Sequence, residues 1–321
     1  MLSWQGRIIR LYLNYIKFTG DYNDPIENLR QIVDGGARFG KFPKSAQSEN
    51  ITIEHIPAEL ILPPKADVHS ALLYLHGGGY ATGSIKSHRA AAGQIAEAGK
   101  IHTLIIDYRR PPEYPFPAAL EDALTAYDWL QKNGYERIII MGDSAGGGLA
   151  LATVISLRDN QAHMPLLVIC LSPLIDVECT GESVITNAGR DPWLTTGMKT
   201  LFNYYVGQND PRDPLISPLY ADFTNLPPIV VYVGTDEILL SDSTRLAEKA
   251  KDAGVDVQIK IWPGMWHIFP FFAPFVPEAS QAVTEIGDAI KHRIGMHIDT
   301  RSAGAIERQF QAEVLNKSES N

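Results

Sequence analysis

Short apolar runs alternate with longer stretches of helical length along most of the chain. There are six such runs, and most lack strict polar alternation, as expected of strands buried on both faces: Ala71–Leu75, Ile101–Ile106, Arg137–Met141, Leu166–Leu171, Ile229–Val233 and Val257–Ile261. Between or after them lie candidate helices at Ser87–Ala98, Ala118–Lys132, Ala145–Arg158, Ser241–Ala253 and Glu278–Ile294. This order predicts an α/β fold, with a mostly parallel central sheet flanked by helices on both faces.

Three segments depart from this alternation of strands and helices. Ile51–Ile56 alternates and is followed by two prolines, so we expect one antiparallel lead-in strand at a sheet edge. Residues 1–45 and 177–225 interrupt the pattern, the second with a helix near Thr195–Tyr205, and long excursions of this kind often cover a site. We therefore expect a core of residues 46–176 and 226–300, a two-part helical cap, and a polar tail at 301–321.

Composition narrows the class of protein. The 321 residues hold 28 Lys and Arg against 37 Asp and Glu, and the net charge of −9 opposes binding to nucleic acid. No apolar run reaches the length of a membrane span. The two cysteines, Cys170 and Cys179, form no zinc-type spacing or disulfide framework, so we expect reduced thiols and a cytoplasmic location.

The first 18 residues differ from this acidic average. Met1–Phe18 holds Arg7, Arg10 and Lys17, no acidic residue, and many Leu, Ile, Tyr and Trp. The arginines interrupt any signal-peptide core, and no small-residue cleavage site follows. We expect an amphipathic helix packed on the protein's own surface, with a segment lying on a membrane surface as the alternative.

The strongest chemical motif is Gly142-Asp143-Ser144-Ala145-Gly146. It follows an apolar strand and opens an Ala- and Leu-rich helix, which is the context that a nucleophile elbow requires. Glycines are needed at both flanks because the turn is tight, and Ser144 becomes the candidate nucleophile. Upstream, Ala71–Leu75 ends in His76 and three glycines, two of whose amides, with that of Ala145, could bind a tetrahedral oxyanion.

A nucleophilic serine needs a base and an orienting acid near the carboxyl ends of strands. His267 follows the last predicted strand in a Gly- and aromatic-rich loop, and it is the best placed of nine histidines. Asp236 follows Ile229–Val233 and is the leading acid, with Glu237 beside it as the fallback and Asp242 too far into the next helix. The order Ser144, Asp236, His267 is that of the α/β-hydrolases.

Residues 50–295 resemble the hormone-sensitive-lipase-like, or bacterial family IV, esterases of the α/β-hydrolase superfamily. The resemblance rests on several motifs: His76-Gly77-Gly78-Gly79, the run Asp107–Ala118, the serine elbow, Ser172-Pro173, Ser217-Pro218-Leu219, and the loops of Asp236 and His267. It implies an α/β-hydrolase fold, Ser144 as nucleophile, His267 as base, Asp236 as its orienter, and the amides of Gly77, Gly78 and Ala145 as the oxyanion hole. The chain departs from the family with Arg110-Pro111 and with Glu237, rather than proline, after the expected acid.

The resemblance implies a serine carboxylesterase for short- to medium-chain acyl esters, working through an acyl-enzyme and needing no cofactor or metal. Aromatic residues of the cap and of the His267 loop, together with Leu194, could form apolar walls: Trp193, Leu194, Phe202, Tyr204, Tyr205, Trp266, Phe269, Phe271 and Phe272. A lactonase, amidase or acyltransferase could use the same triad, and a non-catalytic receptor is the remaining alternative. The partner is a small-molecule ester, and a homodimer through the edge strand Val257–Ile261 is implied by resemblance only.

Overall fold

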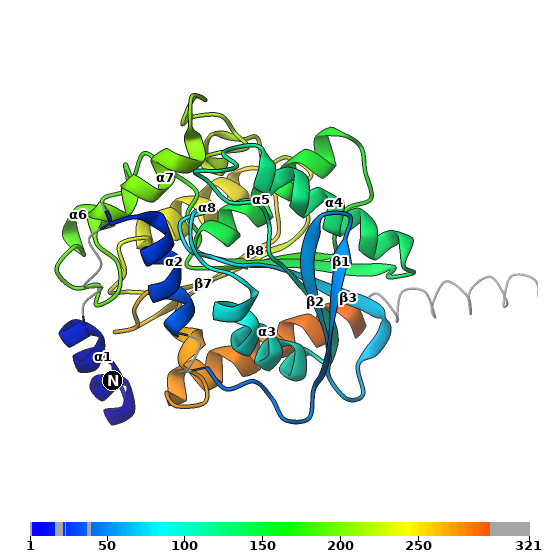
Figure 1. Ribbon diagram of the computed structural model, residues 1–321, viewed down its shortest axis with the longest axis horizontal. Coiled ribbons are helices and arrows are strands. Elements are labelled where there is room, and N and C mark those ends of the chain that lie inside the picture. The colour runs from blue at the N-terminus through cyan, green and yellow to red at the C-terminus, as the bar shows by residue number, and fades with distance from the viewer. Residues whose placement is uncertain (1, 17–21, 23, 37–39, 296–321) are drawn as a thin grey trace, which may run out of the picture.

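An eight-stranded sheet forms the centre of the protein, with strand order β1-β2-β4-β3-β5-β6-β7-β8. The computed structural model describes residues 2–16, 22, 24–36 and 40–295 (Figure 1). The strands are β1 (Gln47–Ile53), β2 (Ile56–Leu62), β3 (Asp67–Leu75), β4 (Ile101–Ile106), β5 (Arg137–Asp143), β6 (Leu167–Leu171), β7 (Ile229–Gly234) and β8 (Val257–Trp262). From β4 to β8 all neighbours are parallel, whereas β2 runs antiparallel to both β1 and β4. The mostly parallel sheet predicted from the apolar runs is confirmed.

Helices cover both faces of this sheet. On one face lie α3 (Ile85–Gly99) and a last helix over residues 277–295; on the other lie α4 (Ala118–Lys132), α5 (Ala145–Asp159) and α8 (Leu240–Asp252). Successive side chains of a strand point to opposite faces, so Leu73 joins one apolar cluster and Leu72 the other. The central strands are buried on both faces, which explains why their sequences lack polar alternation.

The expected lead-in strand is wrong in one respect, because it is a hairpin. The predicted segment Ile51–Ile56 crosses the turn between β1 and β2, where Ile53 pairs with Ile56. Glu54 adopts a positive φ of 55°, as a tight two-residue turn requires. The turn lacks the Asn-Gly or Asp-Gly signal that usually marks such hairpins, which is why the alternation of β1 seemed to continue through it.

Two segments distant in sequence lie beyond the carboxyl ends of the parallel strands. The first contains α1 (Trp4–Ile16) and α2 (Ile26–Gly35); the second contains α6 (Ser183–Thr186), η2 (Thr196–Met198), α7 (Lys199–Val206) and η3 (Pro218–Tyr220). They meet where the Tyr22 side chain is hydrogen-bonded to Thr195 and packs against Gly197. The helix expected within the first 18 residues and the one near Thr195–Tyr205 are both present. No helix in the described part of the chain has the length and apolarity to cross a membrane.

Candidate active site

Ser144 lies on a strained turn between β5 and α5. Its φ of 53° and ψ of −121° are rare for a residue with a side chain. A Cβ on Gly142 would lie 2.1 Å from the carbonyl oxygen of Gly146, and one on Gly146 would lie 2.0 Å from that of Leu75. Glycine is therefore required at both flanks, and the sequence context of a nucleophile elbow is matched by the geometry of one.

The glycine loop after β3 lies directly against this elbow. A Cβ on Gly77 would lie 3.1 Å from Ser144 Cβ and even closer to the Asp143 carboxylate. The Gly77 amide donates to Asp143 Oδ1 at 3.2 Å, which corrects the expectation that it contributes to an oxyanion hole. Among the described residues, the amides of Gly78 and Gly79 have no such acceptor. Gly77 is thus a packing and anchoring position, and the two glycines after it carry the available donors.

His267 is paired with Glu237 and not with Asp236. His267 Nδ1 lies 3.0 Å from Glu237 Oε2, and both side chains are buried. The other carboxylate oxygen of Glu237 accepts hydrogen bonds from Ser172 Oγ at 2.9 Å and from the Gly234 amide at 2.5 Å. The residue that was expected as the fallback, and as a departure from the family pattern, is therefore the one that orients the histidine.

Asp236 points away from the histidine toward residues 1–45 and 177–225, the two segments expected to form a cap and here called the cap segments. Its carboxylate contacts Arg10 Nη1 of α1 at 2.5 Å and Arg190 Nη2 at 2.9 Å. The expectation that Asp236 orients His267 is contradicted, because consecutive residues past the end of β7 direct their side chains to opposite sides of the loop. Arg10 also donates to the Gly264 and Arg190 carbonyls, so this contact joins α1, the second cap segment and the loop after β8.

Ser172, just after β6, connects the three loops of the site. Its hydroxyl donates to Glu237 and accepts from the Ile268 amide at 3.2 Å, next to His267. The flanking residues hold the elbow: the Ser144 amide donates to the Leu171 carbonyl at 2.8 Å, and the Leu174 amide to the Ser144 carbonyl at 2.9 Å. Ser172-Pro173 was noticed in the sequence as a motif, but nothing there assigned this bridging role.

A second buried carboxylate, Asp191, lies near the His267–Glu237 pair. It accepts from the Trp193 and Leu194 amides at 2.8 and 3.0 Å, and from the Ile238 amide at 3.1 Å. Burial raises its pKa, the charge of His267 opposes that rise, and the charge of Glu237 adds to it. Asp191 lies in the aperiodic segment 177–225, where no sequence signal separated it from ordinary loop acids.

His76 supports the glycine loop as a neutral ring. It is buried, its Nδ1 lies 2.8 Å from the Gly77 carbonyl, and it stacks on Tyr108 at 4.2 Å between ring centres. Burial, followed by repulsion from His88, lowers its pKa well below the usual value. Tyr108 donates to the His76 carbonyl at 2.8 Å, so the run after β4 braces this loop.

Ion pairs fix that run in place, both within itself and to neighbouring helices. Arg109 binds Asp122 of α4, and Glu113 binds Arg30 of α2 at 2.7 Å. Arg110, an unusual residue for the family motif, donates to the Gly83 carbonyl and lies 3.7 Å from Asp107. The glycine loop is therefore held from both the core and the first cap segment.

The predicted aromatic residues divide between packing and exposure. Phe202 and Tyr205 of α7 are buried, with Tyr205 stacked on Tyr80 of the glycine loop at 3.6 Å, whereas Tyr204 is partly exposed. A Cβ on Gly79 would lie 2.9 Å from Leu201, so α7 packs on this loop. Near the histidine, Trp193 and Trp266 each meet Phe272 edge to face at 5.6 and 5.5 Å.

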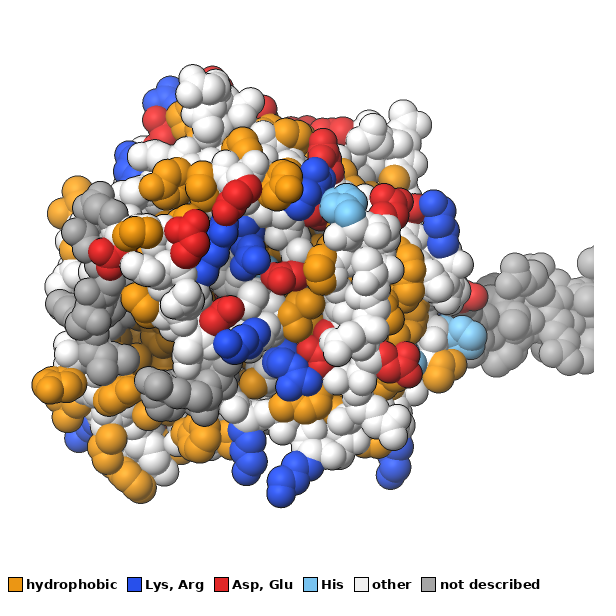
Figure 2. Space-filling view, viewed as in Figure 1, with side chains coloured by type: hydrophobic (Ala, Val, Ile, Leu, Met, Phe, Trp, Pro, Cys, Tyr) orange, Lys and Arg blue, Asp and Glu red, His pale blue; other side chains and the backbone are white. Residues whose placement is uncertain are grey.

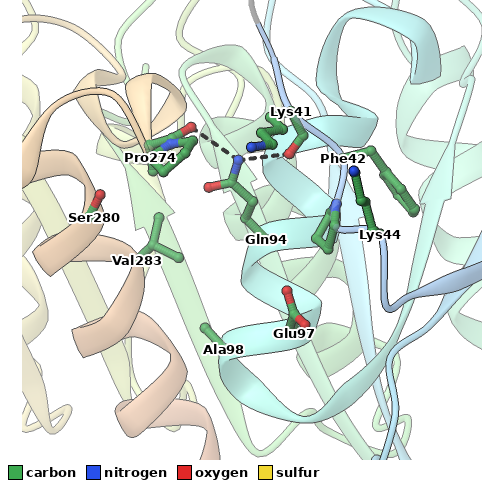
Figure 3. A pocket seen from close by; sticks show the side chains of 11 residues that line it. Lys41, Phe42, Lys44, Gln94, Glu97, Ala98, Pro274, Ser280 and Val283 are labelled. Carbon is green, nitrogen blue, oxygen red and sulfur yellow. Dashed lines mark hydrogen bonds between the residues drawn. The ribbon is translucent and has the colours of Figure 1, made fainter.

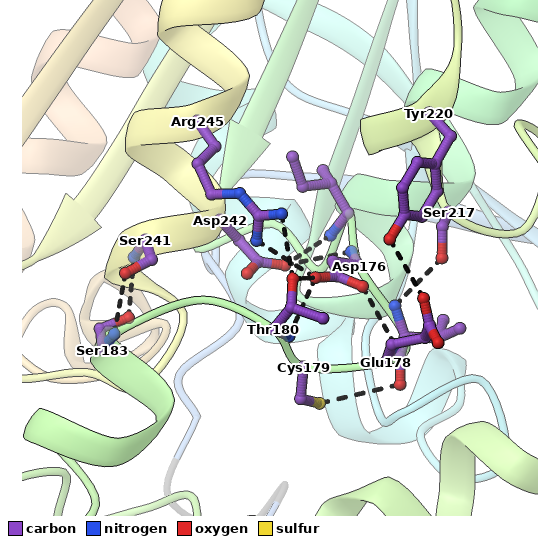
Figure 4. Close-up of polar contacts among 12 residues, drawn as sticks. Asp176, Glu178, Cys179, Thr180, Ser183, Ser217, Tyr220, Ser241, Asp242 and Arg245 are labelled. Atoms are coloured by element: carbon purple, nitrogen blue, oxygen red, sulfur yellow. Dashed lines mark hydrogen bonds and ion pairs between the residues drawn. The ribbon is translucent and has the colours of Figure 1, made fainter. Parts of the chain in front are cut away.

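Asp242 at the start of α8 does not reach the histidine, as expected from its position. Its Oδ2 accepts from the Ile175 amide at 2.9 Å and the Asp176 amide at 3.2 Å, while Arg245 pairs with Asp176 at 3.1 Å (Figure 4). Burial, with added repulsion from Asp176, raises the pKa of Asp242 to about 7. This cluster fixes the point where the chain leaves the core for the second cap segment.

A separate surface hollow of about 360 Å³ lies between α3 and helix 277–295 (Figure 3). It is lined by Phe42, Pro274, Val283 and neighbouring residues, and none of the proposed site residues contributes to it. The Gln94 amide group at its edge already donates to the Lys41 and Ala273 carbonyls at 2.9 and 3.0 Å. Within the described residues, no group of three or more His, Cys, Asp or Glu is arranged to hold a metal ion.

Comparison with known proteins agrees with this geometry. Residues 72–271 match the model of a family with the alpha/beta hydrolase fold. An acetyl-hydrolase of Streptomyces hygroscopicus is 40% identical over 248 residues, which cover 76% of this chain and 83% of the relative. An esterase of Acinetobacter venetianus is 35% identical, over 81% of this chain and 87% of the relative.

Solved structures give the same picture. An esterase from the bacterial hormone-sensitive lipase family superposes with a TM-score of 0.87 at 39% identity, covering 92% of this chain and 99% of that one. The esterase EstE5, in crystals soaked with p-nitrophenyl butyrate, superposes with a TM-score of 0.86 at 36% identity, over 91% and 99%. With the elbow, the glycine loop and the buried His267–Glu237 pair in place, the chain belongs to the hormone-sensitive-lipase family of α/β-hydrolase-fold proteins and is a carboxylic ester hydrolase.

Proposed function

We propose that the protein is a serine carboxylesterase whose triad is Ser144, His267 and Glu237. The observation that carries this assignment is the buried contact of 3.0 Å between His267 Nδ1 and Glu237. Because Nδ1 is occupied, Nε2 is the ring nitrogen that exchanges a proton with Ser144. Ser172 supports the assignment, since its backbone neighbours hold the Ser144 turn and its hydroxyl holds Glu237.

The reaction follows from these positions. Ser144 Oγ attacks the ester carbonyl carbon and gives its proton to His267, and the carbonyl oxygen becomes an oxyanion as its double bond to carbon opens. The amides of Gly78, Gly79 and Ala145 bind that oxyanion, since Ala145 opens α5, where helix amides have no carbonyl partner within the helix. His267 then returns the proton to the leaving alcohol, and water, deprotonated by His267, releases the acid from the acyl-enzyme.

We further propose that residues 1–45 and 177–225 form one cap over this site, and that the substrates are esters of short- to medium-chain acids. The contacts of Tyr22 with Thr195 and Gly197 support the shared cap. The packing of Leu201 and Phe202 against Gly79 places apolar side chains beside the proposed oxyanion donors. Such walls suit an acyl chain rather than a charged substrate.

The direct test is Ser144→Ala, assayed on p-nitrophenyl esters of increasing acyl length. We expect hydrolysis to fall by at least about 10³-fold with an unchanged melting temperature. A serine-directed phosphonate should add to the wild-type protein and to Ser280→Ala, whose hydroxyl donates to the Val276 carbonyl just before helix 277–295, but not to Ser144→Ala. Phosphonate labelling of Ser144→Ala, or retained turnover, would refute the assignment.

A further inference from the structure

The N-terminal helix α1 is apolar on two opposite faces. Successive residues of a helix advance by about 100°, which places Gly6, Ile9 and Leu13 on one side and Trp4, Ile8, Leu11 and Tyr15 on the other. The first side packs on the protein, with Gly6 and Leu13 buried. The second, here called the outer stripe, is exposed by 68% at Trp4, 54% at Ile8, 69% at Leu11 and 89% at Tyr15.

The inner side of α1 is firmly held, so the exposure of the outer stripe does not come from a detached helix. At its start, Ser3 donates to the Glu278 carboxylate through its amide at 2.5 Å and its hydroxyl at 2.7 Å. In its middle, Arg10 binds Asp236. α1 lies at the periphery of the molecule in Figure 1, and Figure 2 shows apolar side chains gathered at the same place.

The size of the outer stripe argues against a protein partner. The stripe consists of four side chains on a helix of 13 residues. A stable protein interface takes about 20–30 residues from each partner. An interfacial helix, by contrast, needs only one apolar stripe inserted about 5–10 Å into a lipid surface.

Composition and charge favour lipid as well. Two of the four outer residues are Trp and Tyr, whose amphipathic rings prefer the boundary between hydrocarbon and water. α1 contains Arg7 and Arg10 but no acidic residue, although the whole chain carries −9. The exposed Arg7 therefore meets lipid phosphate without an acidic residue of the helix opposing it.

We propose that the outer stripe of α1 docks the protein on a lipid surface. The helix would lie parallel to that surface with Trp4, Ile8, Leu11 and Tyr15 inserted, while its inner side stays on the protein. Because Arg10 binds the residue next to Glu237, docking places the proposed active site close to the lipid. The docking itself does not depend on the triad assignment, so Ser144→Ala should bind lipid as the wild type does.

Vesicle flotation of the full chain tests this proposal. The probes are phosphatidylcholine vesicles with and without phosphatidylglycerol, and the variants are Tyr15→Glu and Asn14→Glu. Both positions are exposed on α1 and both variants add one negative charge, but only Tyr15 belongs to the outer stripe. We expect the wild type and Asn14→Glu to float, and the partition of Tyr15→Glu to fall about tenfold or more, with hydrolysis of dissolved p-nitrophenyl butyrate unchanged in both.

Three results would overturn the proposal. One is a wild type that floats with neither vesicle at low salt. Another is an equal loss of vesicle binding in Tyr15→Glu and Asn14→Glu, which would show that the added negative charge alone causes the loss. The third is a wild-type dimer in light scattering that Tyr15→Glu converts to a monomer, which would assign the stripe to a second copy of the chain.

Discussion

Asp236 and Glu237 are neighbours in sequence, yet they belong to different parts of the molecule. Glu237 is bound by groups of the core: His267, Ser172 and the Gly234 amide. Asp236 is bound by Arg10 and Arg190, which come from the two cap segments. One loop therefore holds the histidine on one side and the cap on the other.

The cap adds further contacts to the same loop. Asn187 donates to the Thr235 and Glu237 carbonyls at 3.1 and 2.9 Å, and Asp191 accepts from the Ile238 amide. Core contacts thus fix the carboxylate that orients His267, whereas cap contacts fix the backbone that carries it. Removing a core contact should therefore impair catalysis, whereas removing a cap contact should mainly affect stability.

The largest effect is expected from Glu237→Gln. The amide cannot stabilise the protonated imidazole and favours the wrong histidine tautomer, so kcat should fall by roughly 10³–10⁴-fold. Asp236→Asn, an identical chemical change one residue away, should keep kcat within about tenfold. Steady-state kinetics on p-nitrophenyl butyrate, with circular dichroism as a folding control, compares the two. The reverse ranking would return the role of triad acid to Asp236.

Ser172→Ala should have the next largest effect. It removes the hydroxyl that holds Glu237 Oε1 and the Ile268 amide, but no group that touches substrate. We expect kcat to fall about 10- to 100-fold with KM changed little, because the histidine is held less accurately. Ser172→Thr keeps a hydroxyl but is β-branched at a φ of 46°, so Ser172→Cys is the better conservative control. An unaltered kcat in Ser172→Ala would show that Glu237 is fixed without Ser172.

Asp236→Asn should lower stability more than activity. It weakens two ion pairs to a nearly buried carboxylate, but Arg190 is 60% exposed and its contribution is screened by water. We expect the free energy of unfolding, measured in urea, to fall by roughly 1–2 kcal/mol, and by less at high salt. Arg212→Gln breaks an exposed pair with Glu178 and serves as the control, with little expected change. A salt-independent loss would point to packing rather than charge.

The last effect concerns the pH dependence of stability. The pKa of Asp242 is raised to about 7, so between about pH 4 and 7 the folded state binds more protons than the unfolded state. Its contribution therefore stabilises below the unfolded pKa and is lost as pH rises toward 7. Relative to wild type, the free energy of unfolding of Asp242→Asn should rise by up to about 1.4 kcal/mol for each pH unit across this interval and by nothing further above it. Urea unfolding of both proteins at a series of pH values measures how the difference in their free energies of unfolding changes with pH. A difference that stays constant between about pH 4 and 7 would contradict the prediction.

The strands, the helices and the elbow geometry at Ser144 were predictable because each depends on local sequence. Buried strands require apolar runs, and the elbow requires glycines around Ser144. The acid was not predictable to the residue, since Asp236 and Glu237 lie past the end of β7, where strand alternation no longer tells which side chain points inward. Gly77 was assigned wrongly because its amide partner, Asp143, is distant in sequence.

The positive φ of Ser144 also limits the chemistry that could replace it. Threonine carries the same hydroxyl and could act as a nucleophile, but a β-branched side chain is a severe outlier at that φ. The backbone conformation therefore disfavours threonine at position 144. Cysteine has the shape of serine at Cβ and would meet no such conformational barrier. The elbow therefore requires a side chain that is both nucleophilic and unbranched at Cβ. Ser144→Cys, which exchanges the hydroxyl for a thiol, is the substitution that meets both requirements.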